Sequence, residues 1–69
     1  MLPVTGKDLL KRLRQLGCNV VRIRGSHVRV VCGDCTTTIP IHAGHDLPPG
    51  TLWAIARDLE PCLGKGWLR

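Results

Sequence analysis

The stretch VVRIRGSHVRVV, residues 20–31, decides the fold of this chain. Aliphatic and polar side chains alternate along it, which is the pattern of β-strands with one buried face. Gly25 and Ser26 interrupt the alternation and fit a two-residue hairpin turn with glycine at its first central position. The stretch therefore predicts two antiparallel strands.

The two faces of this hairpin differ in chemistry. In the predicted register Arg24 lies opposite His27, and Arg22 lies opposite Arg29. The aliphatic face consists of Val21, Ile23, Val28 and Val30. Like charges directly opposite each other destabilise a sheet. We therefore expect that a small domain with this arrangement needs the positive field of its arginines for function.

The next segment predicts a third strand. It covers Thr36 to His42, with Ile39 and Ile41 on the aliphatic side, and Pro40 indicates an edge or irregular strand. If residues 33 and 34 form a tight turn, the face of His27 also includes Thr36, Thr38, Pro40 and His42.

Helices are predicted on both sides of the strands. The first begins at Thr5, whose side chain can cap it, and stops at Gly17. Its apolar stripe consists of Leu9, Leu13 and Leu16. A basic stripe, either a solvated face or a ridge that contacts phosphates, consists of Lys7, Lys11 and Arg14. The second helix covers Pro49–Leu59 and is ended by Pro61. Its apolar stripe consists of Leu52, Ile55, Ala56 and Leu59.

This order predicts an α+β domain, α-β-β-β-α, that spans residues 1–69 as one unit. A three-stranded antiparallel sheet with two helices on one face, the aliphatic one, would bury every apolar stripe. The face with His27 and the arginines is left outside.

Positive charge is concentrated in the first half of the chain. Lys and Arg number 10 against 5 Asp and Glu, a net charge of +5, and residues 1–30 hold seven of the basic residues and one of the acidic ones. This asymmetry indicates a polyanionic partner, nucleic acid first. The chain has no Phe and no Tyr, which argues against a sheet that stacks bases.

The N-terminal segment lacks the apolar core of a secretory signal, and no apolar run reaches membrane length. We therefore expect a cytoplasmic protein without membrane contact, whose four cysteines are reduced thiols. Cys18 and Cys62 are expected to be small core residues. An alternative zinc site would use a C-x2-C and an H-x2-H pair, namely Cys32, Cys35, His42 and His45.

His27 is the candidate catalytic residue. RNA cleavage needs a base for the 2′-OH proton, an acid for the leaving 5′-oxygen and positive charge around the phosphate. An imidazole can serve as base or acid near neutral pH. The candidate phosphate-binding residues are Arg22, Arg24, Gly25, Ser26 and Arg29. His42 is a candidate second proton-transfer group, and the alternative for both histidines is an ordinary surface position.

Three motifs, in order, carry a resemblance to a known family: RGSH at residues 24–27, IPIH at 39–42 and LPPGTLWAI at 47–55. Together with the Lys- and Leu-rich segment before them, the chain resembles the HicA family of toxin mRNA interferases over residues 3–60. The resemblance implies a double-stranded-RNA-binding-domain-like (dsRBD-like) fold. It also implies that His27 is catalytic and that His42 matches the second motif histidine.

The activity implied by the resemblance is metal-independent, cofactor-free cleavage of mRNA, which blocks translation. A HicB-type antitoxin would cover the active site and set the oligomeric state. We therefore predict an endoribonuclease toxin. Two alternatives stay open: a non-catalytic RNA- or DNA-binding module on the same fold, and a small zinc-binding interaction domain.

Overall fold

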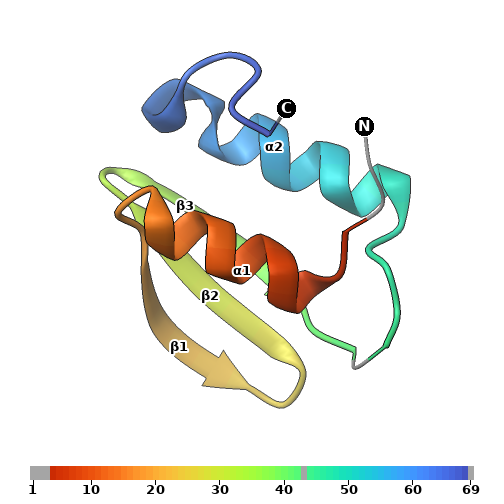
Figure 1. The fold of residues 1–69 in the computed structure, drawn as a ribbon. Helices are drawn as coiled ribbons and strands as arrows, with labels where there is room; N and C mark the ends of the chain where they lie inside the picture. Colours follow the sequence, from red (N-terminus) through yellow and green to blue (C-terminus); the bar gives the residue numbers. More distant parts are fainter. Residues whose placement is uncertain (1–3, 43, 69) are drawn as a thin grey trace.

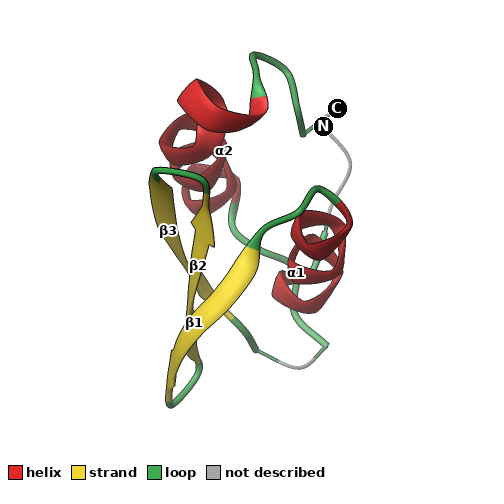
Figure 2. Cartoon of the chain, turned by 90° about the vertical axis from the view of Figure 1, so that its left-hand side faces the viewer, coloured by secondary structure: helices red, strands yellow, loops and turns green. Residues whose placement is uncertain are grey.

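The computed structural model describes residues 4–42 and 44–68, and it confirms the predicted order of elements. The elements in this part of the chain are α1 (Gly6–Gln15), β1 (Asn19–Arg24), β2 (His27–Cys32), β3 (Cys35–Pro40) and α2 (Pro49–Leu63). The strands form an antiparallel sheet in the order β1-β2-β3, and the helices pack on one side of it (Figures 1 and 2). This is the predicted α+β, dsRBD-like arrangement.

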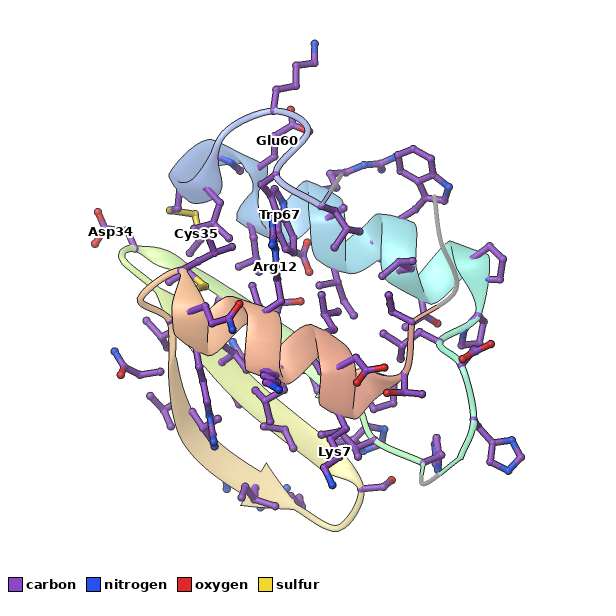
Figure 3. All side chains as sticks on the ribbon, viewed as in Figure 1. Lys7, Arg12, Asp34, Cys35, Glu60 and Trp67 are labelled. Carbon is purple, nitrogen blue, oxygen red and sulfur yellow. A yellow bond between two sulfur atoms is a disulfide. The ribbon has the colours of Figure 1, made fainter. Side chains whose placement is uncertain are left out.

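The hydrophobic core lies between the sheet and the two helices. Its largest fully buried side chains are Leu9, Leu13, Val30, Ile39, Ile55 and Leu59. Thr5 caps α1 as predicted, because its hydroxyl accepts a hydrogen bond from the backbone N–H of Asp8 at 3.1 Å. Trp67, beyond the end of α2, is buried and donates its indole N–H to the carbonyl of Ala56 at 3.0 Å. The tail therefore folds back onto α2 (Figure 3).

The aliphatic side of β1 differs from the prediction. The strand pairing shifts between Val20 and Arg22, so Val20 packs against the core in place of Val21. Val21 is 58% exposed and Ile23 is 69% exposed. The prediction that both are buried is wrong for two reasons. The irregular pairing breaks the alternation at Val21, as a β-bulge does. The tip of the β1–β2 hairpin, where Ile23 lies, extends beyond the helices (Figure 2).

Two element boundaries also differ from those predicted. β3 ends at Pro40, before His42, because Pro40 pairs with His27, the first residue of its partner strand β2. α2 continues through Pro61 to Leu63, and the N–H of Gly64 bonds to the carbonyl of Glu60. A proline this close to the end of a helix removes little hydrogen bonding, so it did not stop the last turn.

All four cysteines form disulfides, and the expectation of reduced thiols is wrong. Cys18 bonds to Cys32, and Cys35 bonds to Cys62. Cys62 is exposed, so it is not a core residue. Cys32 and Cys35 are cross-strand neighbours at the β2–β3 turn, and each meets a cysteine from a different part of the chain. In Figure 3, the label of Cys35 marks the end of the sheet at which the yellow sulfur atoms of the disulfides lie. Spacing along the sequence did not reveal this proximity.

The described helices include none that is long and apolar enough to cross a membrane.

Candidate functional site

Two rows of side chains cross the face of the sheet that the helices leave open. In the first row Arg24 of β1 pairs with His27 of β2, as predicted, and His27 pairs in turn with Pro40 of β3. The second row consists of Arg22, Arg29 and Thr38. The arginines and His27 are exposed, so this face presents imidazole and guanidinium groups to solvent.

These rows enclose a hollow of about 140 Å³. It is lined by Arg22, Arg24, His27, Arg29 and Thr38. Because three guanidinium groups share this hollow with one imidazole, a phosphate bound there would contact cations and a proton-transfer group together. The hairpin alone brings four of these five residues together, and β3 adds the threonine.

Arg29 is held in place by β3. Its Nη1 donates to Oγ1 of Thr38 at 3.3 Å, and its Nη2 donates to Oγ1 of Thr36 at 3.0 Å. These bonds draw the guanidinium toward β3 and away from Arg22, which faces it from β1. The alternation of β3 placed both threonines on this face, but their role as partners of Arg29 was missed. A pair of hydroxyls two residues apart, opposite an arginine, is the signal that could have found it.

The Gly25-Ser26 turn sets the start of β2, where His27 lies. Gly25 has a φ of 59°, which agrees with glycine at the first central position of the turn. The carbonyl of Ser26 accepts the N–H of Ile41 at 2.6 Å, so the chain after β3 also supports the turn. Gly25 and Ser26 themselves lie outside the lining of the hollow.

The structure does not bring His42 into this hollow. It is exposed, two residues beyond the end of β3. The zinc ligand set is not assembled either, since Cys32 and Cys35 bond to different cysteines. Within residues 4–42 and 44–68, no group of three or more His, Cys, Asp or Glu residues could hold a metal ion.

The basic stripe of α1 is separate from the His27 hollow. Lys7, Lys11 and Arg14 are exposed on a helix that packs against the other face of the sheet, as Figure 1 shows for α1. Their side chains border a different hollow along α1. A ligand in the His27 hollow would therefore meet the arginines of the hairpin rather than this stripe.

Fold and site together define a small basic α+β domain of dsRBD-like order with a histidine among arginines on the open face of its sheet. The family model described as the HicA toxin of bacterial toxin–antitoxin systems matches residues 6–60. The chain belongs to this family. It is therefore a toxin of a toxin–antitoxin system, and its partner is a cognate antitoxin. Comparison with curated proteins and with solved structures found no match.

Proposed function

We propose that this toxin is a metal-independent endoribonuclease that cleaves mRNA in the cytoplasm and thereby inhibits translation. The observation that carries the proposal is the hollow in which His27 meets Arg22, Arg24 and Arg29. Membership of the HicA toxin family supports it.

The reaction follows from the groups in the hollow. The 2′-oxygen attacks the adjacent phosphorus, the bond from phosphorus to the 5′-oxygen breaks, and a 2′,3′-cyclic phosphate and a 5′-hydroxyl result. His27 either takes the 2′-OH proton or gives a proton to the leaving 5′-oxygen. The arginines bind the phosphate and stabilise the charge of the phosphorane-like transition state. His42, outside the hollow, is our candidate for the second proton transfer.

A HicB-type antitoxin is the proposed partner that silences this face. The open face is cationic, so an antitoxin with an acidic or otherwise complementary surface would cover it and exclude RNA. The same complex would set the oligomeric state.

The first test compares wild type and His27→Ala on an mRNA, with and without EDTA. We expect the wild type to cleave in EDTA and His27→Ala to lose about 10²-fold or more of the rate, the usual range for a general acid–base group. His27 is exposed, so the variant should fold and bind RNA as the wild type does. His45→Ala, a change at another exposed histidine, is the matched control and should cleave normally.

Two results would contradict the proposal. Full cleavage by His27→Ala would overturn the role of His27 in the reaction. The other is a folded wild type that binds RNA without cutting it, which would favour the non-catalytic RNA- or DNA-binding module. Cleavage abolished by EDTA would instead contradict metal independence. His42→Ala, run beside these variants, tests the second proton transfer and should slow cleavage without weakening RNA binding.

A further inference from the structure

A second hollow adjoins the first at the edge of the sheet. It lies between β3 and α2, has a volume of about 450 Å³, and its lining includes Thr36, Thr51, Ile55 and Asp58. The two hollows share Arg29 and Thr38 as part of their walls. A molecule that extends from the His27 hollow across Arg29 and Thr38 would therefore contact both hollows.

The chemistry of the second hollow differs from that of the first. Its lining has hydroxyl groups, the carboxylate of Asp58 and the side chain of Ala54, with the buried Ile55 behind them, beside the single cation Arg29. A carboxylate disfavours a second phosphate, whereas hydroxyls beside apolar surface suit a neutral group that carries hydroxyls. The second hollow is thus matched to a sugar rather than to another phosphate.

The hydrogen bonds within the hollow leave donors and acceptors free for a ligand. The hydroxyls of Thr36 and Thr38 accept from Arg29, so each can still donate its own proton. Thr37 donates its hydroxyl to Oδ2 of Asp58 at 3.1 Å, which holds the carboxylate at the wall while Oδ1 can accept from a ligand. The polar groups are therefore oriented before a ligand arrives.

We propose that the hollow between β3 and α2 binds the ribose that carries the leaving 5′-oxygen, on the far side of the scissile phosphate from the attacking 2′-oxygen. The inference rests on the proposed function, since the His27 hollow must hold that phosphate. Because the two hollows share a wall, the groups that they bind must be close neighbours in the ligand. In RNA the ribose is bonded directly to the phosphate, so this condition is met. Its 2′-OH is both a donor and an acceptor, which is how a protein distinguishes RNA from DNA at one position. The hollow therefore favours RNA over DNA in binding, in addition to the need of the cleavage reaction for a 2′-OH.

The test measures binding of a short fluorescent RNA and of a DNA of the same sequence, using His27→Ala to prevent cleavage. The variants Thr51→Val and Asp58→Asn are added to it one at a time. Thr51→Val removes a hydroxyl from the second hollow, and Asp58→Asn replaces one charged acceptor oxygen with an amide donor. We therefore expect the RNA-over-DNA preference to fall by about two- to tenfold in each variant, the equivalent of one hydrogen bond. An unchanged preference in both folded variants would overturn the proposal.

Glu60→Gln is the matched control for Asp58→Asn. Glu60 lies on the part of α2 away from the sheet and borders a different hollow (Figure 3). Glu60→Gln removes one negative charge, as Asp58→Asn does. The affinities for RNA and DNA should therefore rise together, and the RNA-over-DNA preference should stay constant. If Glu60→Gln lowers the preference as much as Asp58→Asn, charge rather than the hollow is responsible, and the proposal fails.

A second measurement locates the ribose. Single 2′-deoxy substitutions are placed along the RNA, and their effects are compared in proteins with and without Thr51→Val. One position next to the cut should show non-additive losses, and additivity at every position would contradict the proposal. Cleavage by the wild type is recorded separately. If it fails while the RNA preference still depends on Thr51, the enzyme proposal falls and a ribose site in a binding module remains.

Discussion

The open face concentrates charge at a cost to the sheet. Arg22 and Arg29 are direct cross-strand partners, and the hydroxyls of β3 hold Arg29 on the side away from Arg22. Cross-strand like charges destabilise a sheet by a few tenths to about 1 kcal/mol. The benefit is a gap between guanidinium groups that a phosphate can enter.

Removing one of these charges should stabilise the fold and weaken RNA binding together. We expect Arg22→Gln to raise the free energy of unfolding by up to about 1 kcal/mol, because the repulsion with Arg29 disappears. The slope of log affinity against log salt concentration should decrease in magnitude by about one, because one phosphate contact is lost. Denaturant unfolding and RNA titrations at several salt concentrations check both. A less stable variant, or an unchanged salt dependence, would argue against the role given to Arg22.

The two-nitrogen geometry of the Arg29 guanidinium should contribute to RNA cleavage in addition to its charge. Lysine carries its three N–H donors on a single nitrogen, so it lacks the rigid two-nitrogen geometry with which the guanidinium bonds both threonines. For Arg29→Lys we expect RNA cleavage to fall roughly tenfold, the equivalent of about one charge-assisted hydrogen bond. The salt dependence of binding should stay the same because the charge is kept. Normal cleavage by this variant would show that the geometry set by Thr36 and Thr38 is not needed.

At the scale of elements, the start of α1 is tightly packed against the end of β3. A Cβ atom on Gly6 would lie 2.5 Å from the carbonyl oxygen of Pro40 and 3.2 Å from the side chain of Ile41. Pro40 is also the cross-strand partner of His27. The glycine therefore permits the contact between helix and strand that lies behind the candidate site.

Two glycine substitutions in helices should have opposite effects. Gly6→Ala should destabilise the protein by about 1–3 kcal/mol, since the backbone must move and overpacking outweighs the gain in helix propensity. Gly50→Ala, in the first turn of α2, meets no atom within 4 Å and should be neutral or stabilise by up to about 1 kcal/mol. Thermal or denaturant unfolding compares the two. Equal effects would show that the Gly6 contact does not limit packing.

At the scale of the whole molecule, two disulfides join the helical side to the sheet at one end. Cys18–Cys32 ties the segment after α1 to β2, and Cys35–Cys62 ties β3 to α2. A chain of 69 residues buries too little surface for a large margin of stability, so such cross-links weigh heavily.

Reduction of these disulfides should lower the stability markedly. The sequence separations are 14 and 27 residues, and loops of this size predict a loss of about 3 kcal/mol or more per disulfide. Urea unfolding with and without a phosphine reductant measures the loss. Intact-protein mass should show two hydrogens fewer per disulfide before reduction. Equal stability in both conditions would contradict the prediction, and Cys35→Ala with Cys62→Ala isolates one cross-link.

The local sequence determined most of the fold and much of the candidate site. Alternation around Gly25-Ser26 set the hairpin and the pairing of Arg24 with His27. The leucine spacing set the buried face of α1 at Leu9 and Leu13, whereas Leu16, also predicted in that stripe, caps the helix end and is 43% exposed. These features depend on neighbours within a few residues, where periodicity, turns and caps act. For the same reason the three arginines around His27 could be named before the structure was known.

Only the tertiary structure decided the features that join distant segments. Val21 is exposed because the pairing of β1 with β2 is irregular at that point, and Ile23 is exposed because the hairpin extends beyond the helices. The hydrophobicity of the two side chains did not decide their burial. The disulfides and the hollow between β3 and α2 depend on which residues the packed helices bring beside the sheet. The alternation of apolar and polar residues predicts which face of the sheet a side chain occupies. Which segment covers that face depends on packing across the whole chain.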